Sequence, residues 1–283
     1  MHIIDVNLGG GFLLQYANRG QSQMMGYLIE TPDGKTVMID SGNYCEEDAG
    51  YLYELLKSRG GNIDLWLFTH AHIDHFGALL WLFENKPDFD LKIADMRFDF
   101  PPVEWFKTVE QGWYYDSNRD FAAALEKHKI TPKTITAGEN IKCGEISIEV
   151  LKDARDYENY VKGNEINDSS AVFKVHFPNR DVLFLGDLGW DGGADLLKEI
   201  PNEKLRCGIV QMAHHGQNGV DRAFYEVVQP EICLYCAPDW LWDCDTGGGK
   251  GSGPWKTLEV RRWMEELGVS MSCPHAYGDY KFI

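Results

Sequence analysis

Basic residues are scarce in this chain. Its 283 residues include 27 lysines and arginines against 44 aspartates and glutamates, which gives a formal net charge of −17 with histidine neutral. A field of that sign repels polyanions over about 8 Å at physiological salt, and non-specific nucleic-acid binding needs the opposite sign. The composition therefore excludes a long nucleic-acid duplex as a partner. It leaves room for a small molecule or a short phosphoester, because bound metal ions create a local positive field.

Long hydrophobic runs are missing as well. No window offers the roughly 18 uncharged apolar residues of a membrane-spanning helix, and Asp5 interrupts the N-terminus before a secretory signal could form. Seven cysteines, an odd number in a chain of this size, fit a reducing compartment. Cys233 and Cys236 lie in an apolar strand without a second pair to complete four zinc ligands, which favours core packing. We therefore expect a cytoplasmic protein without membrane association.

Two common catalytic signatures are also absent. The chain has no Gly-rich phosphate loop of the nucleotide-binding type and no Gly-x-Ser-x-Gly motif, so serine hydrolysis has no support. Its 44% hydrophobic content is that of an ordinary globular protein with a large buried core. We see no repeat, low-complexity tract or long linker, and we expect one domain over residues 1–283.

The order of short apolar runs and amphipathic stretches predicts the fold class. Each half of the chain begins with a β-meander and ends in β-α alternation, and strands with one apolar face and helices with one apolar stripe pack as sheet on sheet with outer helices. We therefore expect an α/β (α+β) fold, a four-layer αββα sandwich. The predicted strands are 3–6, 12–16, 24–30, 36–39, 63–68, 145–151, 171–176, 181–185, 207–212 and 232–235, and the predicted helices are 47–59, 76–83, 193–199, 222–228 and 254–267.

Two segments do not fit that skeleton. Residues 96–130 form an aromatic-rich insertion, and residues 239–253 end in a Gly-rich loop. Loops on a rigid scaffold often carry specificity. The alternative is that these aromatic residues pack a helical excursion or a subunit contact, such as that of a homodimer, and the sequence does not separate the two interpretations.

Metal-binding side chains are concentrated at one point of the chain. His70, His72, Asp74 and His75 follow directly on the apolar run that ends at Phe68. Histidines two residues apart project to the same side of extended backbone, and Asp74 and His75 lie where the next helix begins. Imidazole and carboxylate together suit zinc, and also iron or manganese. The cluster therefore predicts a metal site at this strand end.

Three other apolar strands end in residues of the same kind. Asp40 follows residues 37–39, Asp187 follows residues 182–186, and His214 and His215 follow residues 207–213. In open α/β sheets, functional groups at the carboxyl ends of buried strands meet in one crevice. Singly, either aspartate could cap a helix. Together with the histidine cluster, they predict one composite site.

The order of these motifs resembles the metallo-β-lactamase-fold hydrolases. Within that superfamily, the opening at residues 4–11, the segment 167–172 and His214-His215-Gly216 are similar to the hydrolase domain of ComEC-type competence proteins. The resemblance implies that His70 and His72 bind a first metal, that Asp187 bridges to a second, and that Asp74, His75 and one of the paired histidines complete the second site.

Of the paired histidines, we favour His214 as the ligand, since it is nearer the strand end, with His215 touching substrate. The resemblance also implies that Asp40 hydrogen-bonds a ligand histidine and fixes its tautomer. The expected cofactors are two divalent ions, with zinc favoured over manganese or iron. Asp74, His215 and Asp40 are the expected catalytic residues.

The chain departs from the family pattern at the first metal. Many members place a third histidine between the first cluster and the bridging acid, and only His128 and His176 lie in that interval here. His128 has the surroundings of a solvated helix face, and His176 lies at the far end of its strand. The ComEC-like pattern has Asn167 and Ser169 near that place. The alternative to two bound ions is therefore a weak or empty first site and a mononuclear enzyme.

The implied chemistry is hydrolysis by a metal-activated hydroxide, with His215, His275 and Tyr277 as candidates to stabilise developing charge. A phosphodiester or related phosphoester is the favoured substrate. The alternatives are an amide, lactone or thioester at the same site, a redox protein that uses iron in the same ligand frame, and a non-catalytic metal-binding interaction module. Two features argue against the redox hypothesis. The chain has no room for a flavin domain, and it carries His72 where the di-iron relatives have an acid.

Overall fold

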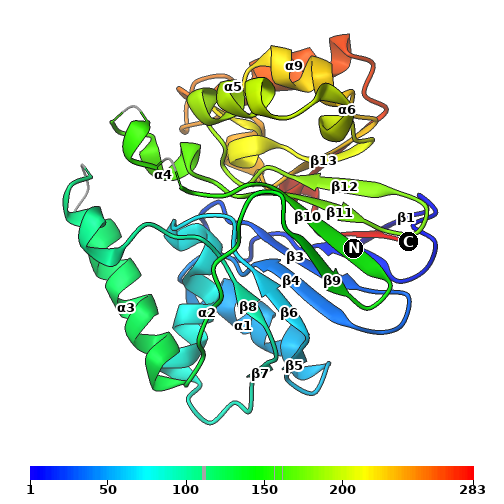
Figure 1. Cartoon of the computed structure of the whole chain (residues 1–283). Helices are drawn as coiled ribbons and strands as arrows, with labels where there is room; N and C mark the ends of the chain where they lie inside the picture. The colour runs from blue at the N-terminus through cyan, green and yellow to red at the C-terminus, as the bar shows by residue number, and fades with distance from the viewer. Residues whose placement is uncertain (110–112, 156, 161) are drawn as a thin grey trace.

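Two seven-stranded sheets packed face to face form the centre of the computed structural model, which describes residues 1–109, 113–155, 157–160 and 162–283 (Figure 1). The strand order of the first sheet is β1 (His2–Ile4), β16 (Tyr280–Phe282), β2 (Phe12–Gln15), β3 (Gly26–Glu30), β4 (Thr36–Asp40), β6 (Leu65–Leu67) and β8 (Met96–Arg97). The second runs β15 (Met271–Pro274), β14 (Ile232–Tyr235), β13 (Ile209–Gln211), β12 (Asp181–Phe184), β11 (Val172–His176), β10 (Ile146–Lys152) and β9 (Asn140–Cys143). The short strands β5 (Asn62–Ile63) and β7 (Lys92–Ile93) pair beside them.

The main core lies between the two sheets. Alternate residues of each strand point inward because successive side chains of a strand face opposite sides. Tyr27 of β3 and Phe184 of β12 meet edge to face across the interface, with ring centroids 5.0 Å apart. Both side chains are fully buried, as are Ile39, Phe173 and Leu234 in the same cluster. Sheet-on-sheet packing of this kind fixes the two halves of the chain relative to each other.

Helices cover the outer face of each sheet (Figure 1). On the first sheet lie α1 (Glu46–Lys57), α2 (Ile73–Asn85) and α3 (Trp113–Lys127), whose apolar residues cluster with Trp66 and Phe68. On the second lie α5 (Trp190–Glu199), α6 (Asn202–Leu205), α7 (Arg222–Val228) and α9 (Thr257–Glu266). The shorter helices are η1 (Val103–Lys107), η2 (Tyr157–Asn159), α4 (Glu165–Asp168), η3 (Ala213–Gly216), α8 (Asp239–Trp242) and η4 (His275–Tyr277). The predicted αββα order is confirmed.

Two strands of the first sheet add to the predicted order of elements. The C-terminal strand β16 leaves the second sheet and lies between β1 and β2 of the first. The insertion 96–130 begins with β8, which pairs in parallel with β6 and so belongs to the skeleton. Strands of two or three residues carry too little pattern to identify a partner, so their placement depends on tertiary packing. Within the described residues, no helix has the length and apolar character that crossing a membrane requires.

The strand directions bring the candidate residues to one place. β4 and β6 are parallel neighbours in the first sheet, and β12, β13 and β14 are parallel neighbours in the second. The carboxyl ends of parallel neighbours lie at one edge of a sheet. Asp40 is the last residue of β4, and the histidine cluster, Asp187 and the paired histidines follow the ends of β6, β12 and β13.

Candidate metal centre

The loop between β6 and α2 supplies four ligand-type side chains. His70 Nε2 and His72 Nδ1 lie 3.0 Å apart before the helix begins. Asp74 and His75 occupy the first turn of α2, for which His72 is the N-cap residue. Because helical residues turn by about 100° per position, Asp74 and His75 leave the loop in different directions from His70 and His72. One short segment thus contributes to two groups of metal-donor atoms. The first group contains His70 and His72, and the second contains Asp74 and His75.

Asp187 lies between these two groups. Its Oδ1 is 3.3 Å from His75 Nε2, and its Oδ2 is 3.8 Å from His70 Nε2. Gly186, just after β12, makes this approach possible, because its φ of +55° is left-handed and a Cβ there would lie 2.8 Å from Thr69 Cβ. The Asp187 side chain is 1% exposed, so its charge is held away from solvent. The carboxylate is placed to bridge two ions.

His215, rather than His214, enters the second donor group. Its Nε2 is 3.2 Å from Asp74 Oδ2 and 3.3 Å from Asp187 Oδ2. His214 Nε2 lies 3.9 Å from Asp187 Oδ2, and His214 lines the open cavity. This arrangement differs from the expectation that His214 is the ligand and His215 the substrate contact. The reason is local: both residues have left-handed backbone angles, with φ of 51° and 58°, so the chain reverses and the second imidazole points inward.

Two acceptors fix the orientation of the ligand histidines. Asp40 Oδ2 accepts a hydrogen bond from His75 Nδ1 at 2.7 Å, and the carboxylate also accepts from the backbone N–H and the hydroxyl of Thr69, each at 2.8 Å. The backbone carbonyl of Cys236 lies 3.1 Å from His215 Nδ1. A histidine that donates through Nδ1 presents the lone pair of Nε2. Asp40 therefore lies where the resemblance places it, behind a candidate ligand.

The geometry and chemistry of these residues fit two metal ions. Asp74, His75, Asp187 and His215 form one group of donor atoms within 4.8 Å of one another, and His70, His72 and Asp187 form a second. Bonds of about 2.0–2.1 Å around a tetrahedral ion place neighbouring donors about 3.3 Å apart, close to the contacts of Asp187 with His75 and His215. His75 Nε2, His215 Nε2 and Asp187 Oδ1 are buried without a hydrogen-bond partner among the described residues. Buried polar atoms without partners are costly, so these atoms are arranged for a cation.

The pKa values of the histidines in the metal-free chain also indicate a place for positive charge at the second donor group. Burial opposes protonation of His75, but the carboxylates of Asp187, Asp40 and Asp74 outweigh it and raise its pKa well above the ordinary value. The same balance of burial against Asp187 and Asp74 raises the pKa of His215 to about 9. In His72, burial dominates and lowers the pKa to about 4. A cation at the second group would take the place of the protons on His75 and His215.

An open cavity of about 290 Å³ gives access to the centre. Gln23 lies at its wall, donates to Asp74 Oδ2 at 3.3 Å, and accepts from Gln217 at 3.1 Å. The cavity is lined by Ser22, Gln23, Asn43, His72, Ile73, Asp74, Tyr114, Asn167, Asp187 and His214. Sequence reasoning missed Ser22, Gln23 and Asn43, since single polar residues in loops carry no pattern that separates them from surface residues.

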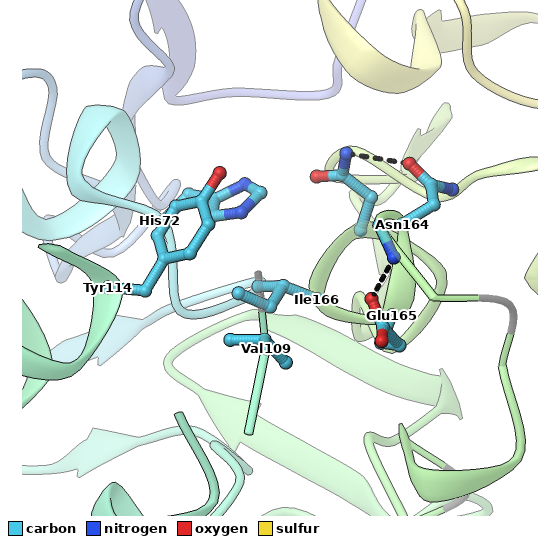
Figure 2. A pocket seen from close by; sticks show the side chains of 8 residues that line it. His72, Val109, Tyr114, Asn164, Glu165 and Ile166 are labelled. Carbon is cyan, nitrogen blue, oxygen red and sulfur yellow. Dashed lines mark hydrogen bonds between the residues drawn. The ribbon is translucent and has the colours of Figure 1, made fainter. Parts of the chain in front are cut away.

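A smaller pocket of about 60 Å³ adjoins the first donor group, and Figure 2 shows it from close by. The Tyr114 ring of α3 stacks on His72, with centroids 4.9 Å apart and planes at 27°. Val109 and Ile166 form the apolar side, and Asn164 lies opposite His72 in this view. The aromatic insertion thus both packs on the first sheet, through Phe121 and its neighbours, and lines the site through Tyr114.

The residues considered for a third histidine lie in different places. His128 is stacked on Phe83 at 4.3 Å and is half-buried, not on a solvated helix face, and His176 bonds Asp181 at 2.8 Å at the far end of β11. Ser169 donates its hydroxyl to the Ile166 carbonyl. Asn167 does line the cavity, and its Oδ1 is buried without a hydrogen-bond partner among the described residues.

The auxiliary candidates at the C-terminal end do not line either cavity. His275 is buried, and desolvation, followed by the charge of His215, lowers its pKa to about 3. Tyr277 is 61% exposed and accepts a hydrogen bond from Trp242 Nε1 through its hydroxyl. Cys236, of the Cys-x-x-Cys pair, packs in the core with its Sγ 3.1 Å from the Tyr27 hydroxyl, and all seven cysteines are free thiols.

Comparison with known proteins identifies the fold. The model of the metallo-beta-lactamase superfamily matches residues 21–136. The metallo-beta-lactamase fold protein YhfI from Bacillus subtilis superposes with a TM-score of 0.56 at 10% sequence identity, over 96% of this chain and 99% of that one. The chain has the metallo-β-lactamase fold. The family match covers less than half of the chain, and the superposition at 10% identity shows the fold alone.

Other solved structures superpose on the chain to a similar extent. CmlA, a diiron β-hydroxylase from Streptomyces venezuelae, gives a TM-score of 0.53 at 13% identity, over 96% of this chain but only 54% of CmlA. Unliganded yeast PDE1 gives 0.51 at 12% identity, over 94% of this chain and 97% of that one. No curated protein sequence shows significant similarity to the chain. The family match covers the first histidine cluster but ends before Asp187 and His215. These two residues are assigned to the site from their positions in the structure.

Proposed function

We propose that the chain is a metal-dependent hydrolase that binds two divalent ions and cleaves phosphoesters, phosphodiesters above all. The observation that carries the proposal is the placement of Asp187, whose carboxylate contacts both donor groups at the base of an open cavity. Zinc is the proposed ion because imidazole and carboxylate donors suit it, and manganese and iron share those donors. When bound, the ions would supply Lewis-acid polarisation and a lowered pKa for a water molecule.

Charge supports an anionic substrate. Two divalent ions carry four positive charges, against the three carboxylates of Asp40, Asp74 and Asp187 at the centre. The filled centre is therefore positive, although the whole chain carries −17. Side chains of the wall that do not ligate a metal are mostly neutral amides and hydroxyls, including Gln23, Asn43 and Tyr114, and these do not repel a phosphate. The ComEC-like motifs favour a diester among the anionic esters.

The protein residues have separate tasks in this proposal. Asp187, His75 and His215 hold the second ion together with Asp74, and Asp40 and the Cys236 carbonyl keep the two imidazoles turned toward it. His70 and His72 hold the first ion, and the Tyr114 ring keeps His72 in place. His214 faces the cavity without belonging to either donor group, so we assign it a contact with the substrate.

Turnover of three chromogenic probes tests the proposal. Zinc- or manganese-loaded protein should cleave bis(p-nitrophenyl) phosphate with a kcat/KM at least tenfold above that for a lactone or a chromogenic β-lactam. Asp187→Asn should abolish turnover because both ions depend on this carboxylate. Asp181→Asn is the matched control, since Asp181 begins strand β12, whose end precedes Asp187, but pairs with His176 outside the site. Preferential turnover of the lactone or the β-lactam would contradict the phosphoester assignment.

A further inference from the structure

A second groove, of about 250 Å³, lies on the side of the molecule formed by the helices of the second sheet. Two indole rings line it, Trp190 at the start of α5 and Trp263 on α9, and the cation of Lys256 lies at the same groove. Gln217 and Asn218 contribute amide groups. None of these residues belongs to the donor groups described above.

The groove is adjacent to the metal centre. Trp190 comes three residues after Asp187, and Gln217 comes two residues after His215. Three residues of chain span at most roughly 11 Å, so the groove wall begins within that reach of the ligands. Hydrogen bonds also join the two places: Gln217 donates to Gln23 at 3.1 Å, and Gln23 donates to Asp74 at 3.3 Å. A ligand of moderate size could occupy both.

The exposed groups of the groove are unusual for this chain. Trp190 is 60% exposed, and the Lys256 ammonium lies 5.5 Å from the centre of its ring. Among the described residues, the other strongly exposed aromatic side chains are Tyr44 and Tyr277, and both use their hydroxyls in hydrogen bonds. No carboxylate of the described residues forms an ion pair with Lys256, although acidic residues outnumber basic ones. An exposed indole with a cation over its ring, and no ion pair to that cation among the described residues, suits a ligand that is both aromatic and anionic.

We infer that this groove binds the base of a nucleotide whose phosphoryl group lies at the metal centre, an inference that rests on the proposed function. Every nucleobase has a π-face that can stack on an indole, so Trp190 would act as the platform. Lys256 would attract the negative charge of the phosphate or of a second phosphate group. The amides of Gln217 and Asn218 would offer hydrogen bonds to the edge of the base. The substrate class is then a nucleotide phosphoester rather than a simple alkyl or sugar phosphate.

Binding calorimetry on the metal-loaded full chain tests the inference without using activity. The probes are adenosine 5′-monophosphate and ribose 5-phosphate, which share a phosphate and a sugar but differ in the base. We expect the wild type to bind adenosine 5′-monophosphate at least tenfold more tightly. Trp190→Ala should remove most of that preference, since stacking on an aromatic side chain contributes about tenfold in affinity, and should leave ribose 5-phosphate unchanged. Trp190→Phe should retain part of it.

Two further variants separate charge from general effects. Lys256→Ala should weaken the binding of adenosine 5′-monophosphate and flatten its salt dependence. Lys198→Ala, on α5 but paired with Asp195, is the matched control and should change neither. Equal affinity for the two probes, or an unchanged preference in Trp190→Ala, would overturn the inference. If the preference is present but no phosphodiester is cleaved, the proposed function fails and the groove assignment stands. If phosphodiesters are cleaved without a preference for the base, only the groove assignment fails.

Discussion

The replacement of Asp40 by asparagine tests how the centre holds its second ion. Asp40 is fully buried and accepts three hydrogen bonds, from the Thr69 backbone N–H, the Thr69 hydroxyl and His75 Nδ1. Asparagine has nearly the same shape but offers only one acceptor oxygen and a donor NH₂ group. If its oxygen stays opposite the Thr69 N–H, its NH₂ group faces His75 Nδ1.

That exchange reverses the tautomer of His75. Nδ1 must then accept a hydrogen bond, which places the imidazole proton on Nε2, the atom 3.3 Å from Asp187 and aimed at the metal position. An ion at the second group needs the tautomer with its proton on Nδ1, and in the variant that proton has no acceptor and the ring lacks the charge of Asp40 behind it. Loss of such an outer partner lowers metal affinity by about 10–100-fold, which is roughly 1.4–2.8 kcal/mol. The first group, through His70 and His72, should be affected much less.

Competition with a chromogenic chelator measures both affinities in one titration. We expect Asp40→Asn to weaken the second-site ion by about 10–100-fold. Asp48→Asn is the control, because Asp48 is also buried and accepts backbone N–H bonds, but from Arg19 and Gly20 away from the centre. An affinity within twofold of the wild type in a folded Asp40→Asn protein would refute the assignment of Asp40 as the partner that orients His75.

Further predictions concern the paired histidines, protons and stability. His215→Ala should lose one ion per chain, whereas His214→Ala should keep both ions and lose turnover. Elemental analysis and kinetics measure these two effects, and the reverse pattern would restore His214 as the ligand. The raised pKa values of His75 and His215 leave both rings protonated near pH 7 in the metal-free chain. Metal binding at the second site should therefore release about two protons at pH 7, and the metal affinity of that site should rise as the pH increases toward about 9. Calorimetry in buffers of different ionisation enthalpy measures this release, and a value near zero would contradict the predicted protonation. Removal of the ions with a chelator should lower the Tm by several degrees, since an ion at 100 times its Kd stabilises the fold by about 2.7 kcal/mol; an unchanged Tm would mean that the centre is not coupled to folding.

Much of the fold and of the site could be predicted from the sequence because the decisive signals are local. Apolar strands that end in histidine or aspartate placed His70, Asp187 and Asp40 at neighbouring strand ends, and parallel pairing brings such ends together. The helix at residues 222–228 follows from its apolar spacing and begins after the N-cap Asp221, whose side chain accepts from the Phe224 N–H.

The sequence could not decide what depends on backbone direction or on distant packing. Whether His214 or His215 enters the centre is set by left-handed angles at both positions, which no neighbouring residue type indicates. The partner of β16 depends on packing between residues nearly 270 positions apart, as in the pairing of Phe282 with Leu13. The same holds for Tyr114, whose stacking on His72 joins the aromatic insertion to the site.

Metal content of protein purified without chelator tests the central claim most directly. Elemental analysis should find close to two zinc or manganese ions per wild-type chain, and Asp187→Ala should retain far fewer because its carboxylate belongs to both donor groups. One ion per chain, lost on replacement of His215 but not of His70, would restrict the centre to the second group. No metal in the purified protein, and none taken up on titration, would contradict the assignment of this site as a metal centre and with it the proposed hydrolase.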